Sequence, residues 1–87
     1  KNKIIELETY FRKKAKRISS IKKIKGRGLM LGIEFPFEVK ELRRKLILEE
    51  RIFTGGSSNK NLIRILPPLT IEKKDIDFFF NSLKKLT

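Results

Sequence analysis

The 87-residue chain contains no cysteine, no histidine and no tryptophan. Without cysteine it can form no disulfide and offers no thiol for catalysis or metal binding. Because histidine is missing as well, a zinc or iron site is not expected. The side chain that most often serves as an acid or base near neutral pH is therefore also missing.

Long apolar segments are missing too. No apolar run approaches the roughly 20 residues that a membrane-spanning helix needs, and the N-terminal residues lack the hydrophobic core of a signal peptide. We accordingly expect a cytoplasmic protein without membrane contact. The sequence begins at Lys1 rather than at methionine, and Ile4 already falls in a helical pattern. Residues 1–87 are therefore expected to be one small domain of a longer protein.

Positive charge is what the chain has in excess. Its net charge is +12, and eleven Lys and Arg residues lie between Lys1 and Arg27 against only Glu6 and Glu8. Such a segment could bind a phosphate backbone, so a free-standing basic module that binds RNA or DNA is the alternative function. However, readers of single strands usually display aromatic residues on a sheet, whereas the strands expected here carry aliphatic ones. Lysine-rich surfaces also serve plain solubility, so nucleic acid is the weaker interpretation.

Hydrophobic spacing predicts three helices. Apolar residues recur at three- and four-residue steps in residues 3–18, again after Pro36, and again after Thr70, which is a plausible N-cap. The residues expected on the three buried faces are, in chain order, Ile4, Leu7, Phe11, Ala15 and Ile18; Val39, Leu42, Leu46 and Ile47; and Ile76, Phe79, Phe80 and Leu83. Phe78 lies off the third stripe, so it would cover a sheet edge or meet another domain.

Four short strands are expected between these helices, at residues 21–25, 29–35, 51–54 and 62–66. Gly26-Arg27-Gly28 would connect the first two, with glycine supplying positive φ. Gly32 would mark a close backbone approach, and Met30 would fill a gap in the core. The polar loop 55–60 is of a kind that often borders substrate in enzymes. Helices on one face of a small, mainly antiparallel sheet make an α+β domain.

The segment from Asn61 to Thr70 places one arginine inside an apolar run and ends it with Pro67-Pro68. Arg64 falls in the middle of the expected strand, where a guanidinium is costly to bury without a carboxylate partner. Its planar fork of donors suits a carboxylate held through two hydrogen bonds. From the residues alone two interpretations stay open: Arg64 extends from the solvent face of an alternating strand, or it binds a carboxylate.

Two stretches of the chain resemble signatures of one enzyme family. Asn61-Leu62-Ile63-Arg64-Ile65-Leu66-Pro67-Pro68-Leu69-Thr70-Ile71, followed by Asp75-Ile76-Asp77, resembles the C-terminal signature of class III PLP-dependent aminotransferases. Gly26-Arg27-Gly28-Leu29-Met30-Leu31-Gly32-Ile33-Glu34 resembles a second signature of that family, in the expected order. Within the family the chain is most similar to acetylornithine aminotransferases, and the lead-in Ile52-Phe53-Thr54-Gly55-Gly56 is also typical of them.

The resemblance covers the whole chain but only the C-terminal part of such an enzyme. It implies the small domain of a fold-type I aminotransferase, which recognises substrate and closes the active site. Arg64 would then bind the α-carboxylate of the amino-acid substrate. The implied substrates are acetylornithine or another acylornithine, with 2-oxoglutarate and glutamate as the second pair, in arginine biosynthesis. Arg27 varies in type among relatives, so no substrate role is assigned to it.

The same resemblance implies where the rest of the catalytic machinery lies. Pyridoxal 5'-phosphate, its Schiff-base lysine and the groups that bind its phosphate would belong to a large domain upstream of Lys1. This chain by itself would then contain no catalytic and no cofactor-binding residue, and it would be inactive alone. Enzymes of the family are typically homodimers, so the full-length protein is expected to be one.

Overall fold

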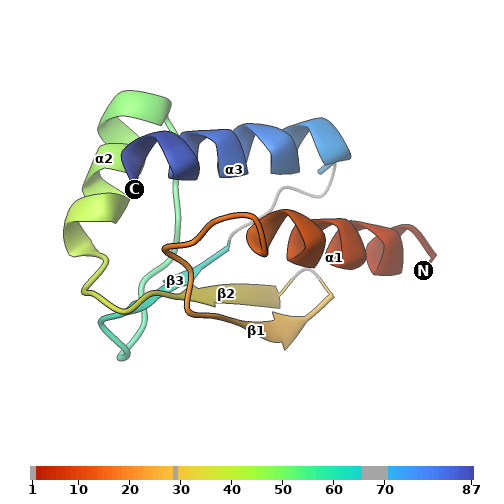
Figure 1. Cartoon of the computed structure of the whole chain (residues 1–87), viewed down its shortest axis with the longest axis horizontal. Helices are drawn as coiled ribbons and strands as arrows, with labels where there is room; N and C mark the ends of the chain where they lie inside the picture. Colours follow the sequence, from red (N-terminus) through yellow and green to blue (C-terminus); the bar gives the residue numbers. More distant parts are fainter. Residues whose placement is uncertain (1, 29, 66–70) are drawn as a thin grey trace.

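The computed structural model describes residues 2–28, 30–65 and 71–87. The elements within these ranges are helix α1 (Asn2–Ala15), strands β1 (Lys23–Arg27) and β2 (Met30–Glu34), helix α2 (Lys40–Glu50), strand β3 (Leu62–Arg64) and helix α3 (Lys73–Leu86). Figure 1 shows α1 and α3 side by side above the sheet, with α2 at one end. The predicted α+β class is confirmed, and the sheet is antiparallel throughout its described strands.

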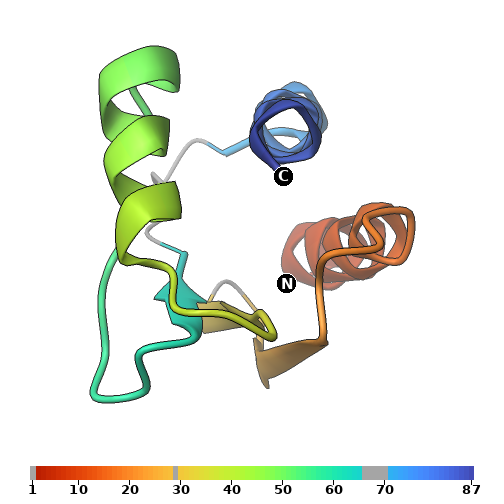
Figure 2. The same ribbon diagram turned by 60° about the vertical axis from the view of Figure 1, so that its left-hand side comes forward.

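The register of the sheet decides which residues face the helices. β2 lies in the middle of the order β1-β2-β3. Ile24, Ile33 and Ile63 form one row across the three strands, and Lys25, Gly32 and Arg64 form the next. Because side chains alternate between the two faces of a strand, neighbouring rows face opposite ways. Ile33 and Ile63 are fully buried, so their row faces the helices, which Figure 2 shows on one side of the sheet. We call the other side the open face.

The hydrophobic core lies between the helices and this isoleucine row. Phe11 of α1 meets Phe80 of α3 edge to face, with ring centroids 4.8 Å apart. Most of the predicted buried stripes are confirmed by the buried core residues Leu7, Phe11, Ala15, Ile18, Leu31, Ile33, Phe35, Val39, Leu42, Leu46, Ile63, Ile76, Phe80 and Leu83. Two predicted members, Ile47 and Phe79, are only half-buried. Ile4, at the start of α1, is 42 % exposed.

The first hairpin turns later than predicted. β1 runs from Lys23 to Arg27, rather than over residues 21–25, and Gly26 pairs with Leu31. Gly26 and Gly28 do adopt positive φ, of 96° and 62°. A Cβ on Gly26 would lie 2.1 Å from the backbone oxygen of Met30, so no side chain fits at that position. The glycine therefore serves within the strand pair, and the turn itself begins at Gly28.

The strand predicted at residues 51–54 does not form. In this segment the pairing consists of a single bridge, between Gly55 and Arg64. α2 ends at Arg51, whose φ of 57° turns the chain away from an extended course. The carbonyl of Thr54, which a strand would offer to a neighbour, instead accepts a hydrogen bond from the Arg43 side chain.

Two further expectations are wrong in detail. Met30 does not fill the core, because the pleat of β2 places it on the open face with Gly32, where it is 77 % exposed. Helix α3 has Glu72 as its N-cap, in a capping box with Asp75, rather than Thr70. Thr70 itself, together with Leu29, Leu66, Pro67 and Pro68, lies outside the described residues.

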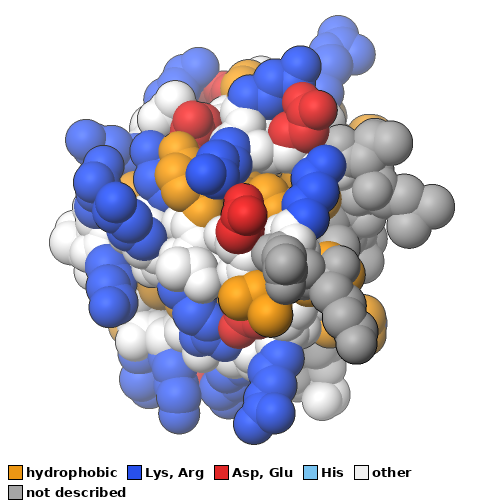
Figure 3. Space-filling model, turned by 90° about the vertical axis from the view of Figure 1, so that its right-hand side faces the viewer, with side chains coloured by type: hydrophobic (Ala, Val, Ile, Leu, Met, Phe, Trp, Pro, Cys, Tyr) orange, Lys and Arg blue, Asp and Glu red, His pale blue; other side chains and the backbone are white. Residues whose placement is uncertain are grey.

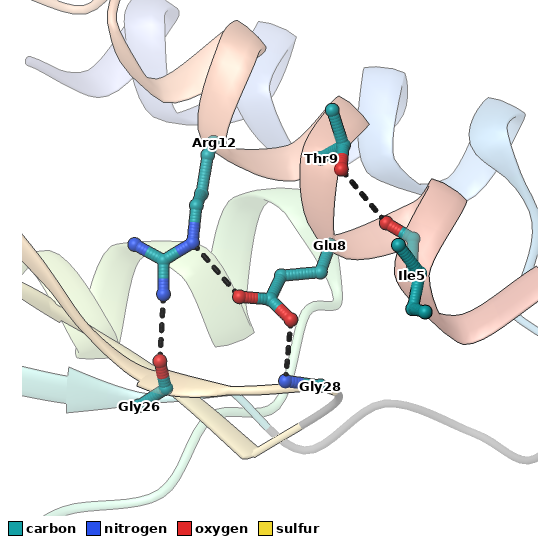
Figure 4. Close-up of polar contacts among 6 residues, drawn as sticks. All are labelled: Ile5, Glu8, Thr9, Arg12, Gly26 and Gly28. Atoms are coloured by element: carbon teal, nitrogen blue, oxygen red, sulfur yellow. Dashed lines mark hydrogen bonds and ion pairs between the residues drawn. The ribbon is translucent and has the colours of Figure 1, made fainter. Parts of the chain in front are cut away.

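A polar clamp joins α1 to the β1–β2 hairpin (Figure 4). The Glu8 carboxylate accepts hydrogen bonds from the Gly28 N–H at 2.8 Å and from Arg12 Nε at 3.0 Å. Arg12 Nη2 in turn donates to the Gly26 carbonyl at 2.6 Å. The backbone bond from Gly28, and then the Arg12 guanidinium, hold the pKa of Glu8 below its usual value. The Glu8–Arg12 ion pair of α1 is therefore hydrogen-bonded to the hairpin backbone at both Gly26 and Gly28.

We expect Glu8→Gln to destabilise the chain in a pH-dependent way. A carboxyl whose folded pKa is lowered contributes stability above its unfolded pKa, and that contribution is lost as pH falls through the folded pKa. The difference in Tm between wild type and Glu8→Gln should therefore shrink as pH is lowered from about 7 to about 3 in thermal unfolding followed by circular dichroism. Glu6→Gln, at an exposed position of the same helix, is the control. A difference that stays constant across this range would contradict the clamp.

We also expect Arg51→Gly to stabilise the chain, because a side chain at positive φ is strained and glycine is not. The gain should be roughly 0.5 to 1 kcal/mol in the free energy of unfolding, measured by urea denaturation. Glu49→Gly, within the same helix, should instead cost about 1 kcal/mol. If both variants lose stability equally, the left-handed C-cap carries no strain.

Candidate functional site

Arg64 is the last residue of β3 and its side chain is exposed on the open face. Its N–H donates to the Gly55 carbonyl at 2.9 Å, and its carbonyl accepts from the Gly55 N–H at 2.8 Å. Arg64 thus lies in a strand, as predicted, but at its end rather than in its middle, and its side chain faces solvent. A carboxylate arriving from outside the chain could therefore reach this arginine without disturbing the core.

Both cross-strand neighbours of Arg64 are glycines. Gly32 of β2 lies on one side of Arg64 and Gly55 on the other, so neither neighbour carries a side chain. A Cβ on Gly32 would be 3.2 Å from Leu62 Cδ1, so the group that closely approaches Gly32 is a side chain and not the backbone that was predicted. Gly32 is buried beneath Leu62, whereas Arg64 stays exposed.

The charges near Arg64 leave it without a carboxylate partner in the described ranges. Lys25, in the same row of the sheet, pairs with Glu34 at 3.4 Å. Burial alone would raise the pKa of Glu34, but its hydrogen bond with Lys25 and the charges of Lys25 and Lys22 outweigh this and lower it. The six ion pairs found among these residues do not include Arg64. Its guanidinium is thus available to an anion that another molecule or another part of the protein supplies.

The contact between Arg43 and Thr54 was not predicted from the sequence. Arg43 of α2 donates from Nε to Thr54 Oγ1 at 3.1 Å and from Nη2 to the Thr54 carbonyl at 2.9 Å. In the sequence Arg43 resembles any charged residue on the solvent face of a helix, since the acceptor lies 11 positions away in an irregular segment. The nearest sequence signal is Gly55-Gly56, because glycine often marks a close approach.

An apolar groove opens where residues 51–54 pass α3. Its volume is about 380 Å³, and its lining includes Phe11, Ile52, Phe53, Ile65, Phe78 and Phe79. Phe53 is 70 % exposed and Phe78 is 53 % exposed. Figure 3 shows one face of the molecule, where hydrophobic side chains reach the surface between surrounding Lys and Arg side chains. Large aromatic rings left in water are typical of surfaces that meet a partner.

Basic side chains also line a second hollow, of about 320 Å³, between the end of α1 and β1. They are Arg12, Lys16, Lys22 and Lys23. In the part of the chain that the structure describes, no three acidic side chains gather as a metal ion would need. None of the helices in that part is long and apolar enough to cross a membrane.

Comparison with known proteins assigns the chain to a family. Residues 1–87 match the family Aminotransferase class-III, and the chain belongs to that family. It is 33 % identical to the acetylornithine aminotransferase of Methanocaldococcus jannaschii, over 98 % of this chain and 22 % of that protein. It is 38 % identical to the acetylornithine aminotransferase of Aquifex aeolicus, over 93 % of this chain and 21 % of that protein. The chain thus spans about a fifth of the length of these relatives.

Similarity of structure agrees with this assignment. The ornithine aminotransferase of Toxoplasma gondii, solved with partial occupancy of PLP at its active site, superposes with a TM-score of 0.75. The match covers 97 % of this chain and 21 % of that one at 24 % identity, which supports the fold alone. The fold is therefore that of a portion of a fold-type I aminotransferase, as the sequence predicted.

The surroundings of the lysines bear on where pyridoxal phosphate could be held. A Schiff-base lysine has to lie in a pocket that can depress its pKa and hold the cofactor ring. Every described lysine is instead exposed or half-buried on the surface of a helix, strand or loop; Lys14, one of the half-buried ones, pairs with Asp77 at 3.2 Å. No step of a reaction can therefore be assigned to the cofactor from this chain.

Proposed function

We propose that this chain is the C-terminal small domain of a longer PLP-dependent aminotransferase, where it recognises substrate and closes the active site. Membership of the family and the order of the two signatures support this proposal. The proposed substrates are acetylornithine or another acylornithine, with 2-oxoglutarate and glutamate as the second pair. The full-length enzyme would act as a homodimer in cytoplasmic arginine biosynthesis.

The exposed Arg64, which has no ion-pair partner among the described residues, is the observation on which this role depends. Its backbone is fixed by two hydrogen bonds to Gly55, and its cross-strand neighbours Gly32 and Gly55 carry no side chain. A guanidinium held in this way can bind a carboxylate through two parallel hydrogen bonds, which fix both distance and rotation. We propose that it binds the α-carboxylate of each substrate and so orients the bond at Cα that is to be broken.

Pyridoxal phosphate, when bound in such enzymes, supplies the electron sink that stabilises negative charge at Cα. The cofactor, its lysine and its phosphate-binding groups are proposed to lie in a large domain outside this chain. The part assigned to residues 1–87 is then limited to substrate binding, orientation and the exclusion of water. Isolated residues 1–87 are expected to be inactive.

The apolar groove with Phe53 and Phe78 supports a contact with that large domain. We propose that the missing part of the polypeptide covers these two rings, since relatives are about five times longer than the part that this chain matches. Burying an exposed aromatic ring against another domain stabilises the contact through the hydrophobic effect.

Binding of RNA or DNA is the second candidate, favoured by the hollow lined by Arg12, Lys16, Lys22 and Lys23. Against it, the described strands β1, β2 and β3 carry no aromatic residue on which a base could stack. Membership of an aminotransferase family also accounts for the chain without a nucleic-acid partner. We therefore prefer the aminotransferase role.

We expect Arg64→Lys in the full-length enzyme to raise KM for glutamate and to lower kcat/KM. The loss should be on the order of 2 to 4 kcal/mol of transition-state stabilisation, because a lysine cannot reproduce the two parallel hydrogen bonds of the guanidinium. Steady-state kinetics with both substrate pairs measure it. Arg27→Lys, on the same face of the sheet, is the matched control and should behave as wild type. Wild-type kinetics of the Arg64→Lys enzyme would show that Arg64 does not bind the substrate.

We expect Phe78→Lys to destabilise the full-length enzyme more than isolated residues 1–87. The ring would be covered only in the longer protein, so the extra loss there should be about 1 to 3 kcal/mol in the free energy of unfolding. Asn81→Lys adds the same charge at an exposed position of α3 and serves as the control. Equal losses of the Phe78→Lys variant in both proteins would show that no other domain covers this ring.

A further inference from the structure

The backbone of Arg64 is held by Gly55 on one side and, through its neighbours in the chain, by the central strand on the other. In an antiparallel pair a residue directs both of its backbone groups to the same neighbour, and successive residues alternate between neighbours. The N–H and carbonyl of Arg64 both bond to Gly55, at 2.9 and 2.8 Å, whereas the N–H of Ile65 bonds to the Leu31 carbonyl of β2 at 2.9 Å. Gly55 is therefore the partner of both backbone polar groups of Arg64, while the chain next to Arg64 is held by β2.

Gly55 in turn is not held by a continuous strand. Its pairing with Arg64 is an isolated bridge, and the preceding residues from Arg51 onward are irregular. The start of this segment is held by the Ile52 N–H, which donates to the Leu46 carbonyl at 2.9 Å. Next to Gly55, the side chain of Arg43 in α2 holds Thr54, through Nε to Thr54 Oγ1 and Nη2 to the Thr54 carbonyl. Thr54 is only 7 % exposed, so water competes weakly for these bonds.

Arg43 also packs closely against Gly56, the residue that follows Gly55. A Cβ on Gly56 would lie 2.7 Å from Arg43 Nη1, so the guanidinium occupies the space that a side chain there would need. Two donors of one rigid plane meet two acceptors of Thr54, a geometry that the single ammonium of lysine cannot provide. The neighbouring Arg44 differs, since it pairs with Glu41 on the exposed surface of the helix.

We propose that Arg43 is a positioning residue for Arg64. It fixes Thr54, the adjacent Gly55 binds both backbone groups of Arg64, and the guanidinium of Arg64 is thereby presented at a defined place on the open face. This inference rests on the proposed function, in which Arg64 binds the α-carboxylate of the substrates. Because the amino donor and the keto acid both carry that carboxylate, loss of Arg43 weakens binding of both.

Amide hydrogen exchange in the full-length enzyme tests the coupling itself. In Arg43→Gln the amides of Gly55 and Arg64 exchange about tenfold faster or more, because local opening of the loop becomes easier. The amide of Ile65, bonded to β2, keeps its wild-type rate and shows that the sheet is intact. Arg44→Gln, one position away on the same helix, leaves all three rates unchanged. If Arg43→Gln fails to fold, Thr54→Val, which removes one of the two acceptors, takes its place in the same measurement.

Kinetics then test whether Arg43 acts through Arg64. Arg43→Gln raises KM for both substrates by about threefold to tenfold, while kcat changes less and the absorption spectrum of the bound cofactor is unchanged. Arg43→Lys does not restore KM fully. In an Arg64→Lys background the same Arg43→Gln substitution has little further effect, since the group that it positions is already altered.

Each outcome separates the two proposals. Unchanged exchange at Gly55 and Arg64 in a folded Arg43→Gln enzyme overturns the positioning role, whatever Arg64 binds. A rise in KM that persists in full in the Arg64→Lys background overturns it too, because Arg43 then acts by another route. Faster exchange combined with wild-type kinetics of Arg64→Lys overturns the proposed function of Arg64 and leaves its mechanical link to Arg43 supported.

Discussion

Burial of the isoleucine row beneath the helices is the constraint on which the rest of the structure depends. Ile33 and Ile63 lie fully buried in adjacent strands, and a slip of one residue in their register would turn every side chain to the opposite face. Because Ile63 must face inward, its neighbour Arg64 must face outward. The hydrophobic effect thus determines indirectly where the one arginine of the strand is presented.

That arrangement places different demands on the two faces of the same sheet. The inner face needs bulky aliphatic residues to fill the core, whereas the open face around Arg64 carries Gly32 and Gly55. A glycine in a strand weakens it, since it contributes no side chain to packing. The two glycines thus weaken the sheet locally at the place where Arg64 is exposed.

The helices contribute in two distinct ways. α1 and α3 cover the core and are joined to the hairpin and to each other by polar contacts such as Glu8 with Gly28 and Tyr10 with Asp77. The hydrogen bond from Tyr10, together with that from Lys14, holds the pKa of Asp77 below its usual value in spite of partial burial. α2, by contrast, reaches through Arg43 to an irregular segment next to β3. The position of α2 therefore affects the segment that pairs with Arg64 at the edge of the open face.

The sequence by itself determined the class of fold, the amphipathic faces and the strand that contains Arg64. These features follow from hydrophobic periodicity and from glycine and proline at element ends, which are local properties of the chain. The family was also recognisable, because its two signatures are short and contiguous. Local signals were less reliable in two places. The apolar side chain of Met30 suggested a core position, and the side chains of residues 51–54 suggested a strand, but neither prediction is correct.

Only the tertiary structure decided the pairing of Gly55 with Arg64 and the contact of Arg43 with Thr54. Both depend on where α2 ends and how the chain turns at Arg51, which adopts a left-handed conformation that its side chain does not favour. The partners of these contacts lie 9 and 11 positions apart, and in each pair one residue, Gly55 or Thr54, lies outside the helices and strands, where sequence spacing gives no signal. Whether an arginine is a solvated surface charge or a structural contact is thus decided by the acceptors that folding brings to it.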